Sequence, residues 1–200
     1  MPDAFIYDNP DVVFMGINKI ASTTILNTLG YNQNDGKMQV KEGVLGLPRF
    51  KQSYNHKKGV SYYRELLPSH FIFAFVRNPY DRVVSYFEWN KRHNPSIPDF
   101  PDFLKSRIAS PNFFKGDFKR QTFSIDDPAK CDFIGRFENF ANDFDKVMKL
   151  LDIEFKGLEL WINKTEHGRY QEYYTSPDLI DIVTEKFKKD IETFNYTYES

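Results

Sequence analysis

Residues 71–86 read FIFAFVRNPYDRVVSY, and this stretch decides the class of fold. Its first part, Phe71–Val76, is a short unbroken apolar run, which is typical of a strand buried on both faces of a parallel sheet. A helix start follows at once, because Asn78 is a good N-cap, Pro79 suits the first helical position and Asp81 makes the first turn acidic. A strand that leads directly into a helix is the repeating unit of α/β folds.

The same strand-then-helix pattern recurs on both sides of this stretch. Val12–Gly16 is a second buried strand candidate, followed by a polar turn and a short helix over Thr23–Leu29. Cys131–Phe137 is a third, followed by a helix whose apolar residues recur at helical spacing from Phe140 to Leu151. Strands that alternate with helices predict an α/β, three-layer fold with a central, mostly parallel sheet, as a single domain over residues 1–200.

Composition argues against several classes of protein. The 200 residues carry 27 Lys and Arg against 28 Asp and Glu, and this balance argues against a general nucleic-acid partner. A single cysteine, Cys131, excludes internal disulfides, and no Cys/His ligand set for a metal is present. No apolar run approaches the ~20 residues of a membrane span, and Met1–Phe5 lacks the features of a secretory signal. We therefore expect a cytoplasmic protein without metal or membrane partner, unless the chain is a piece of a longer one.

The polar turn after Val12–Gly16 carries residue types that bind phosphate-like anions. Lys19 supplies a full charge, while Ser22, Thr23 and Thr24 place hydroxyls at a helix start, where backbone N–H groups attract anions. In parallel sheets ligands bind beyond the carboxyl ends of the strands, where this turn is expected. The nucleotide-binding pattern G-x-x-x-x-G-K-[ST] places its lysine after two glycines, so the early lysine here disfavours an ATPase or kinase. The alternative interpretation is a hydroxyl-capped helix beside a solvated lysine.

A second group of anion-binding residues follows the strand at residues 71–76. Arg77 lies where the strand ends, and Ser85 lies about two turns into the helix on the same general side. A guanidinium fork and a hydroxyl can together hold a phosphate group. The alternative is that Arg77 pairs with Asp81 and that Ser85 bonds a backbone carbonyl. Two anion sites at adjacent strand ends suit a nucleotide that carries phosphates at both ends.

Three blocks of the sequence resemble the sulfotransferases, in order and over essentially the whole chain. Gly16–Thr24, GINKIASTT, resembles their loop for the 5′-phosphosulfate group, usually written P-K-x-G-T-T or N-K-x-A-S-T. Phe73–Tyr86 resembles their 3′-phosphate-binding strand and helix, and Phe133–Phe140 is similar to a block of the carbohydrate-type, family 2 enzymes. The loop matches the second spelling and departs from the first at Asn18 and Ala21, which stand in place of its Pro and Gly.

The resemblance implies a P-loop NTPase-like fold and the donor 3′-phosphoadenosine 5′-phosphosulfate (PAPS), with adenosine 3′,5′-bisphosphate (PAP) as product. It also implies which side chains hold the two ends of this donor. The 5′ side would be held by Lys19, Ala21, Ser22, Thr23 and Thr24. The 3′-phosphate would be held by Arg77 and Ser85.

Sulfuryl transfer resembles phosphoryl transfer, with a loose in-line transition state and charge on the leaving oxygen. We expect Lys19 to stabilise that charge and a histidine to take the acceptor proton. His56 lies 21 positions before Arg77, and the sulfotransferases that this chain resembles carry a catalytic histidine at a similar interval. A solvated histidine in a basic loop is the alternative for His56, and His167 is the reserve base. Other candidate bases are Glu65, Glu88 and Glu138.

The segment Lys37–Arg64 carries seven Lys or Arg against one acid, Glu42. Such a patch beside the acceptor pocket would attract an anionic hydroxyl acceptor, such as a uronate or an already sulfated sugar, although a solvated lysine-rich surface is the alternative. Together with these residues, the resemblance predicts a PAPS-dependent sulfotransferase that acts on a hydroxyl of a carbohydrate. The alternatives are a P-loop nucleotide kinase and a catalytically inactive nucleotide-binding interaction module.

Overall fold

A computed structural model describes most of the chain. The described residues are 4–8, 10–29, 31–34, 37–40, 50–54, 58–115, 118–153 and 167–199. The contacts within the chain divide it into two compact units. Unit 1 comprises Met1–Val76 and Phe123–Asn163, and unit 2 comprises Arg77–Thr122 and Lys164–Ser200. Among the described residues, no helix is both long enough and apolar enough to cross a membrane.

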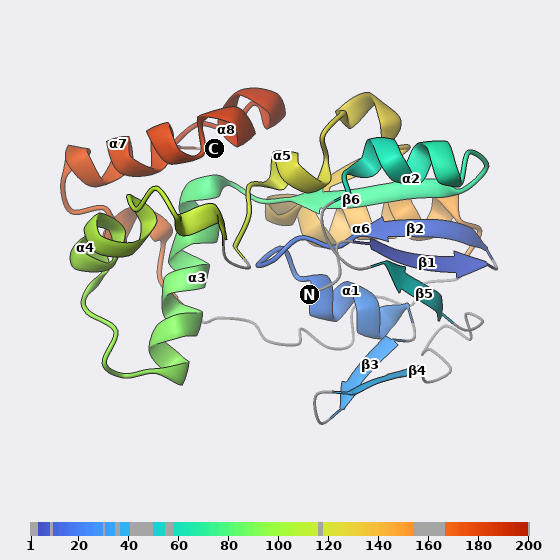
Figure 1. Cartoon of the computed structure of the whole chain (residues 1–200), viewed down its shortest axis with the longest axis horizontal. Helices are drawn as coiled ribbons and strands as arrows, with labels where there is room; N and C mark the ends of the chain where they lie inside the picture. The colour runs from blue at the N-terminus through green and yellow to red at the C-terminus, as the bar shows by residue number, and fades with distance from the viewer. Residues whose placement is uncertain are drawn as a thin grey trace. The chain divides into compact units, whose positions relative to one another are not determined.

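Unit 1 is built on a five-stranded sheet with the strand order β5–β1–β2–β6–β7 (Figure 1). β2 (Asp11–Met15), β6 (Phe71–Val76) and β7 (Phe133–Arg136) are joined by parallel pairing. β1 (Ala4–Asp8) lies antiparallel between β2 and β5 (Phe50–Tyr54), so β5 points in the same direction as β2. Four of the five strands therefore share one direction, which confirms a mixed α/β architecture with a mostly parallel sheet.

The apolar run that forms β6 is buried on both faces, as its composition predicts. Phe73 and Phe75 point to one face, Ile72 and Ala74 point to the other, and all four are fully buried. On the aromatic face, the ring of Phe75 packs against that of Phe140, the first residue of α6 (Phe140–Leu150), with centroids 5.0 Å apart. Protein therefore covers both faces of the central strand, and burial of this kind is what holds a parallel sheet together.

Strand register brings three segments of the chain to one edge of this sheet. Tyr54 of β5 pairs with Ala4, Ala4 pairs with Met15 of β2, and Met15 pairs with Ala74 of β6. Because β5, β2 and β6 point the same way, their carboxyl ends lie at this edge. The segments that follow these three strands therefore all begin at the edge where parallel sheets usually bind ligands.

The remaining elements of unit 1 are short. They include the helices α1 (Ser22–Thr28) and α2 (Val60–Leu66), the 3-10 turns η3 (Pro128–Lys130) and η4 (Phe137–Asn139), and an antiparallel pair formed by β3 (Tyr31–Asn34) and β4 (Lys37–Val40). β1, β3 and β4 were not expected from the sequence. α5 (Gln121–Ser124) spans the boundary between the two units.

Unit 2 is helical in its described part. Its elements are α3 (Pro79–His93), α4 (Phe100–Phe103), the π-helical turn η1 (Leu104–Ile108), the 3-10 turns η2 (Phe113–Lys115) and η5 (Tyr170–Tyr173), α7 (Pro177–Lys186) and α8 (Lys188–Phe194). Aromatic rings dominate its core, where the ring of Phe87 in α3 packs against those of Phe100 and Phe103, with centroids 5.3 Å apart in each pair. This core fixes α3, which begins two residues after Arg77 and contains Ser85.

The start of α3 agrees with the sequence prediction. The side chain of Asn78 accepts a hydrogen bond of 3.0 Å from the backbone N–H of Tyr80, and Pro79 occupies the first helical position. The Nδ2 group of Asn78 also donates to the carbonyl oxygen of Thr197 at 2.9 Å. One side chain thus caps the helix and ties it to the C-terminal segment of unit 2.

Candidate functional site

The loop that follows β2 has an unusual backbone. Lys19 and Ala21 have φ angles of 68° and 64°, in the left-handed region that residues other than glycine rarely adopt, while Ile20 between them lies outside this region. Turns that contain left-handed residues can direct neighbouring backbone N–H groups to one side, and such concave arrays bind anions. The φ angle of Ala21 also explains why a glycine would suit this position, since glycine has no Cβ to clash there.

The side chains of this loop differ in their exposure and in their bonding. Ser22 is buried, and its Oγ donates to the carbonyl oxygen of Ile17 at 2.6 Å, which closes the loop on itself. Thr24 is buried as well, whereas Lys19 and Thr23 are partly exposed. The proton of the Ser22 hydroxyl is therefore directed inward, and a contact between Ser22 and a ligand stays a prediction.

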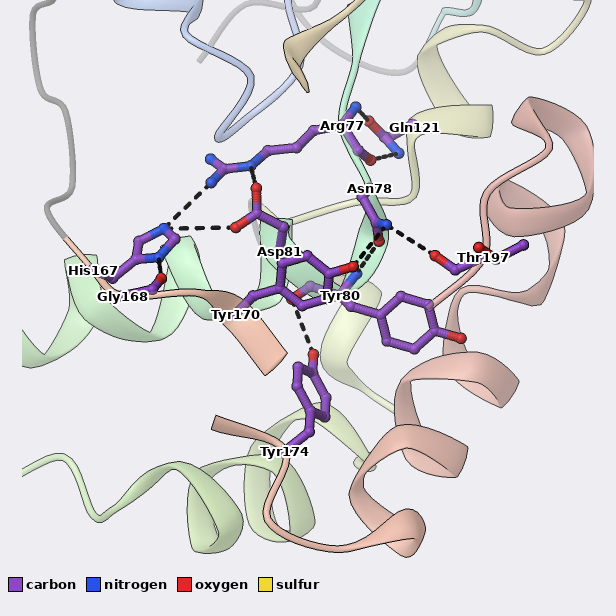
Figure 2. A network of polar contacts seen from close by, with 10 residues as sticks. All are labelled: Arg77, Asn78, Tyr80, Asp81, Gln121, His167, Gly168, Tyr170, Tyr174 and Thr197. Atoms are coloured by element: carbon purple, nitrogen blue, oxygen red, sulfur yellow. Dashed lines mark hydrogen bonds and ion pairs between the residues drawn. The ribbon is translucent and has the colours of Figure 1, made fainter. Parts of the chain in front are cut away.

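Arg77, the first residue of unit 2, is held through both its side chain and its main chain (Figure 2). Its Nε donates to Oδ2 of Asp81 at 2.7 Å, and its side chain is only 6% exposed. Its Nη2 lies 3.4 Å from Nε2 of His167. The main-chain N–H donates to Gln121 Oε1 at 2.8 Å, and Gln121 Nε2 donates to the carbonyl oxygen of Arg77 at 2.9 Å. Arg77 and Asp81 thus form the ion pair that the sequence left open as an alternative.

His167 belongs to this network, and its contacts fix the position of its proton. Nδ1 lies 2.8 Å from the carbonyl oxygen of Gly168, which can only accept, so Nδ1 carries the hydrogen. In the neutral ring Nε2 is then an acceptor and faces the Nη2 donor of Arg77. In the protonated ring Nε2 would carry a hydrogen as well, toward Oδ1 of Asp81 at 3.7 Å. The reserve base therefore lies against the arginine that the resemblance assigns to the 3′-phosphate.

Of the other predicted site residues, the structure describes Ser85 and Glu88 but not His56. Ser85 lies in α3 beyond Asp81 and is 1% exposed. His56 lies outside the described residues, so its role as base stays a prediction. Glu88 accepts a hydrogen bond of 2.9 Å from the hydroxyl of Tyr173; burial, assisted by Glu88, raises the pKa of Tyr173 to about 12.

The two remaining carboxylates, Glu65 and Glu138, are exposed. Glu65 lies 4.0 Å from the ammonium group of Lys130. Among the described residues, no group of three or more side chains could hold a metal ion.

Sequence reasoning missed Gln121 as a partner of Arg77. The two residues are 44 positions apart, and both atoms of the Gln121 amide bond the main chain of Arg77. The neighbouring sequence, KRQTF at residues 119–123, carries no local signature of such a role. Only the folded arrangement of unit 2 identifies it.

Comparison with known proteins gives the family. The model of the sulfotransferase family matches residues 2–197, which is nearly the whole chain. The chain belongs to the sulfotransferase family. A protein of Archaeoglobus fulgidus, described as uncharacterized, is 30% identical over 114 residues, which are 54% of this chain and 88% of that protein. No solved structure matches the chain.

Membership of the sulfotransferase family confirms the resemblance drawn from the three sequence blocks. It supports sulfuryl transfer as the general activity of the chain, and a sulfate donor such as PAPS is what the family implies. The match spans residues of both units. A single sulfotransferase domain over residues 1–200 stays a prediction.

Proposed function

We propose that this sulfotransferase transfers the sulfuryl group of PAPS to a hydroxyl of an anionic carbohydrate, such as a uronate or an already sulfated sugar. The register of the sheet carries the proposal. The carboxyl ends of β5, β2 and β6 lie at one edge, so the segments that follow them begin close together. These segments contain His56, Lys19 and Arg77, which are the proposed base, the proposed cation at the leaving group and the proposed 3′-phosphate ligand.

The loop after β2 is proposed to hold the 5′-phosphosulfate. Its left-handed residues suit a concave array of N–H groups, and such arrays bind phosphate-like anions. Lys19, which is partly exposed at this loop, adds a positive charge. α1 has only seven residues, so the loop backbone and the side chains are expected to contribute more than the helix dipole. The residues proposed for this end are Lys19, Ala21, Ser22, Thr23 and Thr24.

Arg77 and Ser85 are proposed to hold the 3′-phosphate. The bond from Nε to Asp81 orients the guanidinium plane, so a phosphate would meet Arg77 through its Nη side. His167 also lies on that side. This arrangement supports His56, rather than His167, as the base, because the 3′-phosphate is attached at the opposite end of the ribose from the reacting sulfur. The parallel strands β2, β6 and β7 with a ligand loop after β2 are consistent with a P-loop NTPase-like fold, which forms part of the proposal.

In the proposed reaction the acceptor oxygen forms a bond to sulfur while the bond between sulfur and the bridging oxygen of the donor breaks in line. PAP leaves with that oxygen, and Lys19 stabilises the negative charge that develops on it. His56 takes the proton of the acceptor hydroxyl. Each atom transferred is thus accounted for by the donor, the acceptor and one base.

Calorimetric titration with PAP, and separately with ATP and Mg²⁺, tests the choice of donor. We expect PAP to bind and Arg77→Ala to weaken PAP binding by roughly 10- to 100-fold, since a hydrogen bond to a charged group contributes about 1.5–3 kcal/mol. Arg92→Ala, at the exposed end of α3, is the matched control and should leave PAP binding unchanged. An ATP response equal to or stronger than that of PAP would contradict the proposal in favour of a nucleotide kinase.

Turnover distinguishes an enzyme from an inactive binding module. Radiolabelled PAPS with a uronate-containing or sulfated glycan should give labelled glycan, and His56→Ala should abolish this product while PAP still binds. Tight PAP binding without turnover of any hydroxyl acceptor by the unmodified chain would favour the inactive module.

A further inference from the structure

The main chain of Arg77 is bonded in the way that a neighbouring strand would bond it. Val76 forms the last pair between β6 and β7, with Arg136, and Arg77 lies one residue beyond. There the Gln121 side chain supplies one acceptor for the Arg77 N–H and one donor for its carbonyl oxygen, at 2.8 and 2.9 Å. Gln121 is completely buried, so these bonds do not compete with water. The two peptide groups that flank the Arg77 Cα are thus fixed by one side chain.

Gln121 is itself fixed by Asp190 of α8. Asp190 is completely buried, and its carboxylate accepts hydrogen bonds from the backbone N–H of Gln121 at 2.8 Å and of Thr122 at 2.9 Å. The hydroxyl of Thr122 donates a third bond to it at 2.7 Å. A buried carboxylate is tolerated only where donors surround it, and here three donors come from two adjacent residues. The start of α5 is therefore anchored to α8.

A buried arginine of α3 holds the same segment from another direction. Arg82 donates from Nη2 to the carbonyl oxygen of Lys119 at 2.8 Å, and its guanidinium lies 4.1 Å from the ring centre of Phe118. Burial lowers the pKa of Arg82 to about 10, against the opposing attraction of Asp190. Residues 118–122 are thus bonded by both α3 and α8, which leaves little freedom for Gln121 to move.

We propose that Gln121, oriented by Asp190, is a positioning residue for Arg77 and sets how strongly the chain prefers donors that carry a 3′-phosphate. The inference rests on the proposed role of Arg77 as the ligand of that phosphate. A displacement of the Arg77 Cα would move the guanidinium relative to the phosphate, and hydrogen-bonded recognition depends steeply on such positions. Gln121 needs no contact with the donor to have this effect.

The experiment compares the affinities for PAP and for adenosine 5′-phosphate, which lacks the 3′-phosphate. The ratio of their dissociation constants, measured by calorimetry, isolates the contribution of that group. Gln121→Met keeps the length of the side chain and removes both hydrogen bonds to Arg77. We expect it to lower the PAP preference about tenfold while affinity for adenosine 5′-phosphate stays within about twofold. Gln171→Met, which changes an exposed glutamine of η5, is the matched control and should keep the ratio.

A second variant and a second measurement keep the test decisive. Asp190→Asn keeps the shape of the carboxylate and weakens its bonds to Gln121 and Thr122, so a smaller loss in the same direction is expected. Hydrogen exchange at the Arg77 amide reports the positioning directly and should accelerate in Gln121→Met. A PAP preference that persists in both variants, or an equal loss for both nucleotides, would overturn the inference alone. Absence of any PAP preference in the unmodified chain would overturn the proposed function together with the inference.

Discussion

Two strand-to-helix connections of this chain carry the proposed donor-binding residues, and they reach that end by different physical means. After β2, the backbone itself is unusual, with left-handed φ angles at Lys19 and Ala21 and a Ser22 hydroxyl that bonds back to Ile17. After β6, no residue of the connection has a left-handed φ angle, and a capped helix begins at Pro79. There the unusual feature is a network of side chains around Arg77 (Figure 2).

This difference determines what each connection depends on. The first loop is built from residues close together in sequence, so its geometry is local, and its backbone strain lies at the two residues Lys19 and Ala21. The second connection depends on residues 44, 90 and 119 positions away from their partners, namely Gln121, His167 and Thr197. Substitutions in the first should act on the loop alone, whereas substitutions in the second should act through the packing of unit 2.

The largest effect is expected from Lys19→Ala in the first loop. If Lys19 stabilises charge on the leaving oxygen, its loss should lower kcat by about 100-fold or more, the scale seen when one oxyanion-stabilising group is removed. Binding of PAP should fall much less, because the loop backbone and hydroxyls stay in place. Lys188→Ala, at the exposed start of α8, is the control and should keep the rate. An unchanged kcat in Lys19→Ala, measured on a true acceptor, would remove this lysine from the chemistry.

Stability should respond most to the second connection, through Asn78→Ala. The variant loses the cap on the Tyr80 N–H and the bond to the Thr197 carbonyl oxygen. Each is expected to contribute about 1 kcal/mol, so the free energy of unfolding should fall by about 2 kcal/mol. Asp127→Ala, which removes the cap of the three-residue turn η3, is the matched control and should cost less. Denaturant titration measures both; an equal loss in the two variants would show that the link to Thr197 contributes nothing.

The contrast between the two connections also separates what the sequence could predict from what it could not. The start of α3 was predicted from Asn78, Pro79 and Asp81, because helix capping depends on residues that are close in sequence. The structure confirms the cap. The apolar run of β6 was equally visible, because a strand buried on both faces is apolar throughout. The role of Gln121 was not visible, since it arises from contacts that only the packing of unit 2 creates.

The strands β1, β3 and β4 were missed for a different reason. β1 has the sequence AFIYD, a run of four apolar residues that lies at the lower limit of a recognisable strand. β3 and β4, with the sequences YNQN and KMQV, show no alternation strong enough to mark a strand. The proposed base, His56, follows β5 but lies outside the described residues. Its proposed role as base rests on the interval between His56 and Arg77 in the sequence, and on the register that brings the end of β5 to the ligand edge.

A smaller effect should separate the two histidine candidates. Nε2 of His167 accepts from Nη2 of Arg77 and so helps to hold the guanidinium in place. We expect His167→Ala, which loses this hydrogen bond, to raise the KM for PAPS by about tenfold and to leave kcat unchanged. His56→Ala should instead lower kcat, because it removes the proposed base. His93→Ala, at the exposed end of α3, is the control for both. A large fall in kcat for His167→Ala would transfer the role of base to His167.

The smallest effect concerns the strained backbone of the first loop, and its sign is the informative quantity. A left-handed residue other than glycine carries a steric cost of about 1–2 kcal/mol, which Ala21→Gly removes, while the added freedom of glycine in the unfolded chain costs about 0.5–1 kcal/mol. The variant should therefore gain roughly 0.5–1 kcal/mol of stability from these opposing terms. Ala141→Gly, on the exposed face of α6, has no such strain to relieve and should lose about 1 kcal/mol. The midpoint temperatures of thermal unfolding of the two variants should thus shift in opposite directions. If Ala21→Gly also lowers the stability, the left-handed backbone at Ala21 is not a source of strain. The contrast between the two connections would then fail at that residue.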